Sequence, residues 1–205
     1  TGQLVGLVSD RDLARVHRLK AAARRTILIG ELMPDEVYTV APQTPIADVV
    51  DQMAREKYGS AVVVDRGQPF GIFTTVDACR ALAELVPNDA KLGAFMTPAP
   101  DTIGHQQTLA VAHELMRKHA FRHLPVLENG TVVGVLSARD VSAIGRLDST
   151  DERALEVWQA MSRDLLTAGP RAGMRRVLQR MAQQKFGSTI VLDRGDVVGI
   201  LTTVD

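Results

Sequence analysis

The sequence predicts a tandem α/β (α+β) fold in which one repeat of about 64 residues, ordered β-α-β-β-α, recurs along the chain. The first observation is a motif found four times: glycine, two apolar residues, Ser or Thr, two variable residues, and Asp. The four copies end at Asp12, Asp77, Asp140 and Asp205. These aspartates lie 65, 63 and 65 residues apart. The second observation is that the repeats alternate in type. Residues 46–77 of the second repeat and 174–205 of the fourth are identical at 16 of 32 positions. The repeats therefore come in unlike pairs, and the pair is itself repeated.

The first helix of each repeat is predicted from apolar residues at positions i, i+3, i+4 and i+7. In the second repeat these residues are Ile46, Val49, Val50 and Met53. We expect Thr44 to be the N-cap and Pro45 to be the first helical residue. The corresponding helices of the later repeats are expected to include 109–116 and 174–181.

Two short buried strands are predicted after this helix, at 61–64 and 70–74 in the second repeat. Asp65-Arg66-Gly67 between them is a hairpin signal. The same signal recurs at 128–130 and 193–195. A second helix is expected to begin after each motif Asp. Because so small a sheet needs a partner to cover it, we expect the repeats to pair into two modules.

The composition excludes several classes of protein. The 205 residues are 45% hydrophobic and 23% charged, and 24 Lys and Arg balance 24 Asp and Glu, which disfavours both disorder and general nucleic-acid binding. The single cysteine, Cys79, cannot form an internal disulfide, and no run of about 18 apolar residues predicts a membrane span. We therefore expect a cytoplasmic protein with no membrane partner.

Neither a metal site nor a catalytic site is predicted. Four of the five histidines lie in the third repeat: His105, His113, His119 and His123. His113 occupies the position of Val50 and Leu178, which predicts that it lies on the apolar face of a helix. No cysteine or carboxylate spacing matches a zinc or iron site. The chain also lacks a phosphate-binding Gly-rich loop with Lys and a Gly-x-Ser-x-Gly elbow, so we expect no enzyme activity.

Longer segments carry a family resemblance. These are the openings LMPDEVYTVAP and FMTPAPDTI, the segment FRHLPVLENGTVVGVLSARDV, and the four motif closings. They resemble the CBS domain, whose tandem pairs form Bateman modules. By this resemblance the domains are 1–26, the C-terminal half of repeat 1; 27–88, repeat 2; 89–150, repeat 3; and 151–205, repeat 4 without its last helix.

The resemblance implies a regulatory module that binds AMP, ADP, ATP or S-adenosylmethionine in clefts between paired repeats. We expect that such a module requires no cofactor. The resemblance also implies a homodimer formed by module packing, and an effector domain or partner outside this chain. The residue chemistry agrees, because a hydroxyl at a helix N-terminus can bind phosphate and an Asp can accept from ribose hydroxyls. The same motif also matches a helix-capping box. An oligomerisation scaffold that uses the motifs only as caps is therefore the alternative, and a nucleotide-consuming enzyme is a weaker one.

The third repeat is the best predicted nucleotide site. Ser137, Arg139 and Asp140 place a guanidinium beside the motif carboxylate, and Asp140 is the single strongest candidate. The resemblance assigns the surface that contacts the base to Thr102, Ile103 and the segment 122–125, in which His123 and Pro125 are the named candidates and Arg122 precedes them. In the first repeat the equivalent motif residues are Ser9, Arg11 and Asp12. The even repeats offer Thr74 with Asp77 and Thr202 with Asp205, without a cation in the motif. We therefore expect a nucleotide to occupy these two sites less readily.

Overall fold

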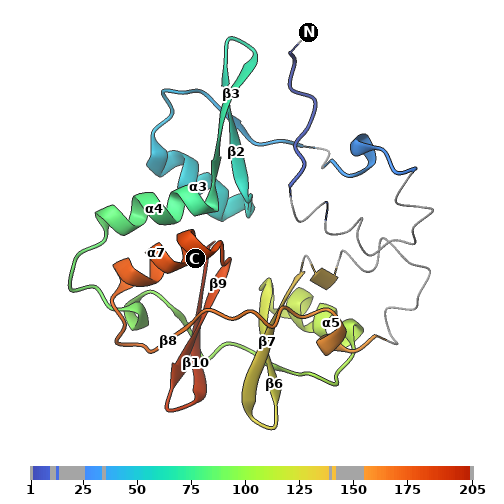
Figure 1. Ribbon diagram of the computed structural model, residues 1–205, viewed down its shortest axis with the longest axis vertical. Coiled ribbons are helices and arrows are strands. Elements are labelled where there is room, and N and C mark those ends of the chain that lie inside the picture. The colour runs from blue at the N-terminus through green and yellow to red at the C-terminus, as the bar shows by residue number, and fades with distance from the viewer. Residues whose placement is uncertain are drawn as a thin grey trace. The chain divides into compact units, whose positions relative to one another are not determined.

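The computed structural model describes residues 2–9, 13, 26–33, 36–138, 140–141 and 155–203. They form two compact units, called unit 1 up to Ala81 and unit 2 from Leu82 onward (Figure 1). Each unit contains both helices and strands. The predicted α/β architecture is confirmed.

Unit 1 contains one three-stranded sheet in the order β1-β2-β3. Its elements are a short 3-10 helix η1 (Ile29–Glu31), β1 (Thr39–Val40), α3 (Ile46–Glu56), β2 (Ser60–Asp65), β3 (Gln68–Thr74) and the start of α4 (Thr75–Leu85). Strand β1 runs parallel to β2, and β3 runs antiparallel to it. Val49 and Met53 of α3 pack on Ala61 of β2 to form a small core. This is the β-α-β-β-α order that the repeat predicts.

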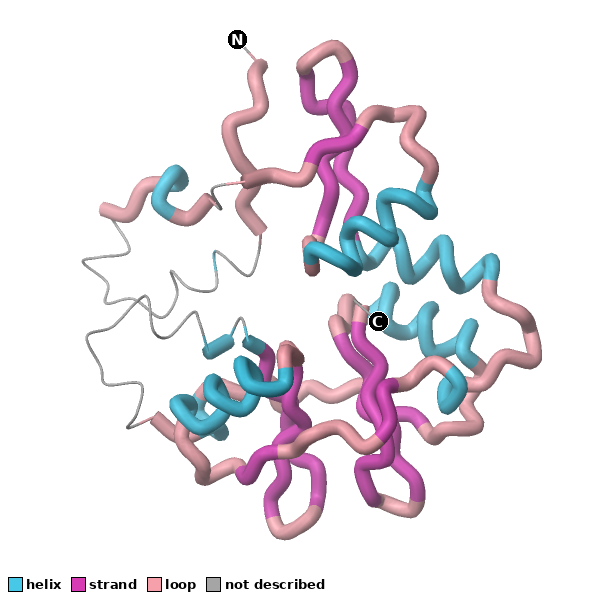
Figure 2. Tube along the Cα trace, turned by 180° about the vertical axis from the view of Figure 1, so that it is seen from behind, coloured by secondary structure: helices cyan, strands magenta, loops and turns pink. Residues whose placement is uncertain are grey.

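Unit 2 contains two such repeats, with sheets in the orders β5-β6-β7 and β4-β10-β9-β8. The third repeat contributes η2 (Leu92–Ala94), β4 (Thr97–Pro98), β5 (Ile103–Gly104), α5 (Leu109–His119), β6 (His123–Glu128) and β7 (Thr131–Ser137). The fourth contributes η4 (Val157–Gln159), β8 (Thr167–Ala168), α7 (Met174–Gln184), β9 (Ser188–Asp193) and β10 (Asp196–Thr202). Figure 2 shows both hairpin turns of unit 2 on one side and the strand ends opposite them.

The predicted hairpins are confirmed, and the backbone explains their sequence. Arg66 and Gly67 both have positive φ, of 48° and 76°. The same pairs of left-handed residues occur at 129–130 and 194–195. Two consecutive positive φ angles define the type I′ turn, whose twist matches that of the flanking strands. Glycine at the second position is therefore a requirement of the turn.

Three local predictions were wrong. Pro45 is the N-cap of α3 rather than its first residue, because its ψ of 136° is extended, and Thr44 makes no capping bond. Helix α4 begins at Thr75, so Asp77 lies inside the first turn instead of preceding it. His113 is exposed, because the buried stripe of α5 is Leu109, Ala112 and Met116, and the next residue after Ala112 is rotated by about 100° away from it.

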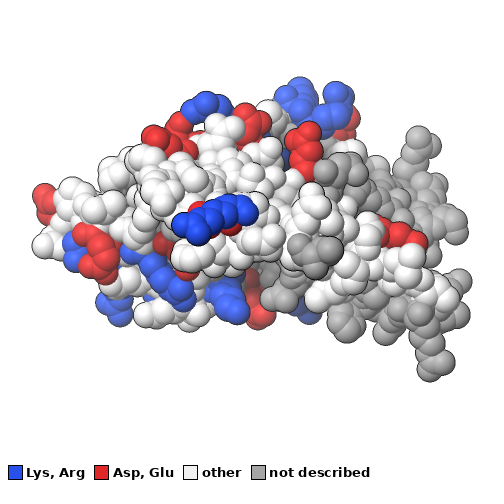
Figure 3. Space-filling view, turned by 90° about the horizontal axis from the view of Figure 1, so that it is seen from above, with Lys and Arg blue, Asp and Glu red and all other residues white. Residues whose placement is uncertain are grey.

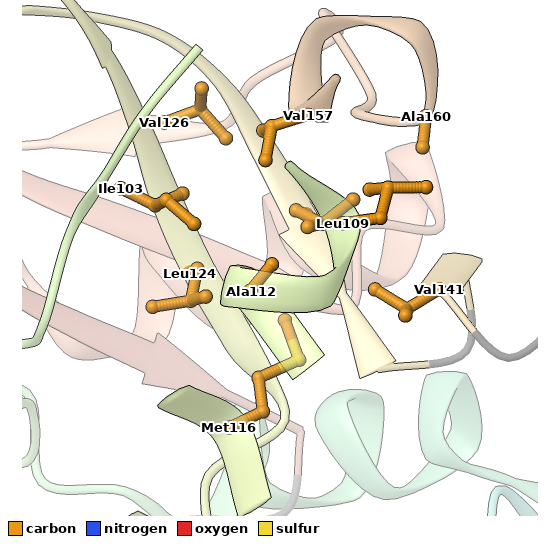
Figure 4. Packing of buried hydrophobic residues seen from close by; sticks show 10 residues of the cluster. Ile103, Leu109, Ala112, Met116, Leu124, Val126, Val141, Val157 and Ala160 are labelled. Atoms are coloured by element: carbon orange, nitrogen blue, oxygen red, sulfur yellow. The ribbon is translucent and has the colours of Figure 1, made fainter. Parts of the chain in front are cut away.

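The two repeats of unit 2 exchange their leading segments, which we define as residues 91–98 and 156–163. Val157 N donates to Gln107 O at 2.8 Å. In the reciprocal contact, Leu92 N donates to Ala172 O at 2.9 Å. Val157 and Ala160 also lie beside Leu109 in the hydrophobic core of the third repeat (Figure 4). Each repeat therefore completes the fold of the other, and the pair is the folding unit.

The motif glycines have a packing role in this exchange. The side chain of Met161 lies on Gly134 of β7, and that of Met96 lies on Gly199 of β10, so closely that a Cβ at either glycine would overlap the sulfur. The adjacent Ser162 exchanges two hydrogen bonds of 2.9 Å with Val135 of β7. Glycine is thus needed wherever the methionine of the partner repeat crosses the strand.

One core hydroxyl predicts a stability gain. Thr189 of β9 is fully buried, and its Oγ1 has no hydrogen-bond partner among the described residues. The other repeats place Ala61 and Leu124 here, both also fully buried. Because an unpaired buried hydroxyl costs about 1–3 kcal/mol, we expect Thr189→Val to raise the free energy of unfolding by about 1 kcal/mol in urea titrations. Thr189→Ser, which keeps the hydroxyl, should be less stable than wild type, and a loss of stability in the valine variant would contradict the assignment.

The described surface carries charges of both signs. Figure 3 shows Lys and Arg side chains among Asp and Glu side chains on one face. Arg55 pairs with Asp51 on the exposed face of α3, and Arg117 pairs with Glu114 on the exposed face of α5. Water screens such exposed pairs, so they contribute little to stability. In the part of the chain that the structure describes, no helix is long and apolar enough to cross a membrane.

Candidate functional site

The motif of the third repeat lies where the hairpin β6–β7 closes. His123 opens β6 directly opposite Ser137, which ends β7. Ala138 N then donates to Arg122 O at 2.8 Å, which ties the strand end to the start of β6. Residues directly opposite each other in an antiparallel pair have neighbouring side chains. The structure therefore brings together the predicted residues His123, Ser137 and Asp140.

The other repeats close in the same way. Thr75 N donates to Gly59 O at 3.2 Å, and Thr203 N donates to Gly187 O at 3.0 Å. Strands β7 and β10 contact each other within unit 2, and their motif ends lie on the same side of it in both views (Figures 1 and 2). The motif ends of the third and fourth repeats therefore open on the same side of unit 2.

Asp140 and Ser137 form a reciprocal cap. Asp140 Oδ2 accepts from Ser137 N at 2.9 Å and from Ser137 Oγ at 2.6 Å. In return, Asp140 N donates to Ser137 Oγ at 3.3 Å. This arrangement satisfies backbone N–H groups at a helix start. Among the described residues, the second carboxylate oxygen of Asp140 accepts no hydrogen bond.

The motif of the second repeat is capped identically but has an additional partner. Asp77 Oδ2 accepts from Thr74 N at 3.0 Å and from Thr74 Oγ1 at 2.6 Å. Arg80 Nη1 donates to the remaining Oδ1 at 3.1 Å. In the sequence register, Ala143 of the third repeat takes the place of Arg80. The sequence analysis expects no cation at the motif of the second repeat, whereas the structure places Arg80, one helical turn further on, against Asp77.

The surroundings of Asp77 set its protonation. Partial burial alone would raise the pKa of this carboxyl, but the hydrogen bonds from Thr74 and the charge and hydrogen bond of Arg80 outweigh it and hold the pKa below its ordinary value of 3.8. The unfolded chain then binds a proton more readily than the folded chain. The stabilising contribution of Asp77 is thus present above the unfolded pKa and is lost as the pH falls through the folded pKa.

The lowered pKa of Asp77 predicts how the stability of the chain depends on pH. We expect Asp77→Asn to be less stable than wild type at pH 7, and the difference should shrink as the pH falls below about 4. Urea unfolding followed by circular dichroism between pH 7 and pH 2.5 measures it. Asp48→Asn, on the exposed side of α3, is the control for general effects of charge. A difference between wild type and Asp77→Asn that stays constant with pH would contradict the assignment.

The predicted base-contacting residues divide into two kinds. Thr102 is exposed, and His123 is partly exposed at the start of β6. Ile103 is only 2% exposed and lies in the core of the third repeat. Pro125 is buried in the middle of β6. The last two therefore offer a ligand only their backbone atoms.

Arg122 lies in the segment that the resemblance assigns to the base-contacting surface, and the structure places it beside the motif, where Arg122 O accepts from Ala138 N. It is partly exposed beside His123, and burial lowers the pKa of its guanidinium. An arginine remains charged at neutral pH even so. The even repeats have glycine here, Gly59 and Gly187. The even repeats therefore have no side chain at the position that Arg122 occupies in the third repeat.

The remaining predicted site residues belong to the first, third and fourth repeats. Arg11, Asp12, Arg139 and Asp205 lie outside the described residues. Ser9 O accepts from Leu13 N at 3.1 Å, in the manner of a first helical turn. Thr202 ends β10 opposite Ser188, which is 8% exposed.

Two histidines of the third repeat each pair with one carboxylate. His105 Nε2 lies 3.2 Å from Glu128 Oε1, and His119 Nδ1 lies 2.6 Å from Asp101 Oδ2. Across the described ranges, no three His, Cys, Asp or Glu side chains gather as metal ligands would. Burial raises the pKa of the Cys79 thiol, which keeps it protonated and poorly nucleophilic.

Comparison with known proteins identifies related sequences. A family model described as the CBS domain matches residues 29–84, 92–144 and 156–205. The protein MJ1225 of Methanocaldococcus jannaschii is 22% identical over 228 residues, which cover 99% of this chain and 81% of that protein. The CBS domain-containing protein YhcV of Bacillus subtilis is 29% identical over 110 residues, covering 54% and 78%.

Solved structures have the same fold. The crystal structure of MJ1225 superimposes with a TM-score of 0.72 at 20% identity and covers 99% of this chain and 82% of that one. A conserved protein of Pyrococcus horikoshii gives a TM-score of 0.62 at 22% identity, covering 99% and 84%. At these identities the likeness establishes the fold and leaves the ligand to be argued from the site.

Proposed function

The chain belongs to the CBS domain family, and from this premise we propose that unit 2 is a regulatory module that binds an adenine-containing ligand. One observation carries the proposal. His123, Ser137 and Asp140 meet at one strand end, and one oxygen of Asp140 has no partner among the described residues. No catalytic step is proposed.

The contacts suggest a role for each residue. The single hydroxyl proton of Ser137 already goes to Asp140, so a phosphate would be bound mainly by backbone N–H groups of the helix start and by Arg122. The free oxygen of Asp140 would accept from a ribose hydroxyl. The ring of His123 would contact the adenine. Phosphate, ribose and base would thus each meet a different group.

The ligand candidates are AMP, ADP, ATP and S-adenosylmethionine. A ligand at about 100 times its dissociation constant stabilises the folded state by about 2.7 kcal/mol. For a chain of this size that corresponds to a rise of roughly 5–10 °C in Tm. Thermal-shift measurements with each compound, and with GMP as the control, test the proposal. No shift with any of the four would contradict it.

The reciprocal cap favours one alternative, an oligomerisation scaffold in which Ser137 and Asp140 serve only the helix start. A scaffold self-associates whether or not ligand is present. A regulatory module instead requires the ligand to bind two states with different affinity. Sedimentation velocity with and without the stabilising ligand measures this difference. A homodimer that ligand leaves unchanged, combined with no thermal shift, would favour the scaffold.

A further inference from the structure

Two histidine–carboxylate pairs lie at the two ends of β5 in the third repeat. Before the strand, His119 Nδ1 lies 2.6 Å from Asp101 Oδ2. After the strand, His105 Nε2 lies 3.2 Å from Glu128 Oε1. The residues that correspond to Asp101 and His119 are Tyr38 and Glu56 in the second repeat, and Leu166 and Gln184 in the fourth. Among repeats 2 to 4, the pair before the strand is therefore particular to the repeat that carries the candidate ligand site.

The pair that contains Asp101 lies at the same end of the sheet as the candidate ligand site. Strand β5 runs parallel to β6, with Ile103 opposite Val126. Because parallel strands start at the same end of a sheet, the residues before β5 lie beside the start of β6. His123 of the candidate site is the first residue of β6. The other pair contains Glu128, the last residue of β6, so it lies roughly 16 Å further along the strand.

His119 connects Asp101 to the segment that leads into β6. Its ring packs edge-on against the ring of Phe121, with 5.7 Å between the ring centroids, and Arg122 follows in the chain. The side chains of His119 and Asp101 are 37% and 42% exposed, so both exchange protons with solvent. The other titratable and charged groups close to this pair are Arg117, which Glu114 binds, and Lys118 in the last turn of α5, and Arg122 and His123 at the start of β6.

We propose that Asp101 and His119 form a proton-linked pair that sets the charge beside the candidate site and thereby its affinity for an anionic nucleotide. The proposal rests on the proposed function of unit 2. An imidazole takes up its second proton between about pH 5 and pH 8. With that proton the pair has no net charge, and without it the negative charge of Asp101 remains. Charges are screened over about 8 Å at physiological salt, so this charge opposes an anion bound at Arg122. Low pH therefore favours binding.

Two substitutions with opposite expected effects test the proposal. Isothermal titration calorimetry follows binding of AMP, ADP and ATP, each in turn, to the full chain at pH 6 and pH 8. At pH 6, His119→Gln should bind about three- to fivefold more weakly than wild type, the size expected of a partly exposed ion pair, and at pH 8 the two should be equal. Asp101→Asn should bind at least as tightly as wild type at pH 6 and about three- to fivefold more tightly at pH 8.

The controls separate charge from structure. Glutamine is the residue of the fourth repeat at this position, Gln184, so His119→Gln suits the end of the helix. His105→Gln changes the pair at the turn end and should bind as wild type does at both pH values. Comparing proteins at the same pH removes the titration of the ligand and of His123, which all of them share. Weaker binding by both His119→Gln and Asp101→Asn at both pH values would indicate a structural role and overturn the proposal.

The remaining outcomes are equally decisive. Nucleotide binding with the same affinity in wild type, His119→Gln and Asp101→Asn would overturn the proposal while leaving the proposed function intact. An effect of His105→Gln equal to that of His119→Gln would also overturn it, because the charge would then act without regard to the site. If none of the three nucleotides binds at either pH, the proposed function itself fails, and this inference fails with it.

Discussion

Gly134→Val is expected to lower the free energy of unfolding of unit 2 by about 3 kcal/mol. The new side chain would occupy the space of the Met161 sulfur and thioether carbons, which lie on this glycine. It would also push away the segment whose Ser162 exchanges two backbone bonds with Val135. Valine has a higher strand propensity than glycine, so propensity alone would raise the stability of β7. A loss of stability would therefore come from the overlap with Met161. Urea unfolding followed by circular dichroism measures it.

Gly71→Val is the matched control. It makes the same change at the same register position, but at a glycine where a Cβ meets no described atom within 4 Å. We expect its free energy of unfolding to stay within about 0.5 kcal/mol of wild type. Pairing Gly134→Val with Met161→Ala should recover part of the loss, because the truncated side chain leaves room for valine. Equal losses at Gly134 and Gly71, or no recovery in the double variant, would contradict the exchanged packing.

Asp140→Asn should weaken binding of the stabilising adenine ligand by roughly 10- to 100-fold, because hydrogen bonds to charged groups contribute about 1.5–3 kcal/mol. An amide can still accept the bond from Ser137 N that the carboxylate accepts at 2.9 Å. The fold should therefore survive while the negative charge beside the ribose is lost. Isothermal titration calorimetry measures the affinity of wild type and variant.

Asp77→Asn provides the comparison for this experiment. Its second oxygen is already bound by Arg80 in the structure, so the variant should bind the ligand as tightly as wild type does. If Asp140→Asn instead keeps full affinity and loses about 1 kcal/mol of stability, Asp140 serves only as a helix cap. Equal effects on affinity at the two positions would remove the distinction between odd and even repeats.

Much of each repeat was predictable because its signals are local. The hairpin turns require glycine at 67 and 130, and the helices follow from apolar spacing. The exchange of leading segments was not predictable in this way. Val157 belongs to the fourth repeat by register, yet it donates to Gln107 of the third. A contact across 50 residues leaves no periodic signal, although the recurrent methionines and glycines were its visible components.

The candidate site was predicted in part for a similar reason. Register alone placed Asp140 and Ser137 correctly, because the motif is a local turn closed by its own hydrogen bonds. Side-chain direction was harder to predict. The side chain of Ile103 faces the core, whereas Arg122 is partly exposed beside the motif. Strand residues alternate between two faces, and a sequence does not say which face a short strand of two residues turns inward.

The central claim is that an adenine ligand binds at the strand end formed by His123, Ser137 and Asp140. Backbone amide NMR of the full chain, titrated with the adenine compound that raises Tm most, tests it directly. We expect saturable shifts of the amides of His123, Ser137 and Ala138, and in Asp140→Asn the same shifts should require roughly 10- to 100-fold more ligand. Saturable binding that leaves these amides unchanged, or shifts confined to Thr74 and Asp77, would contradict it.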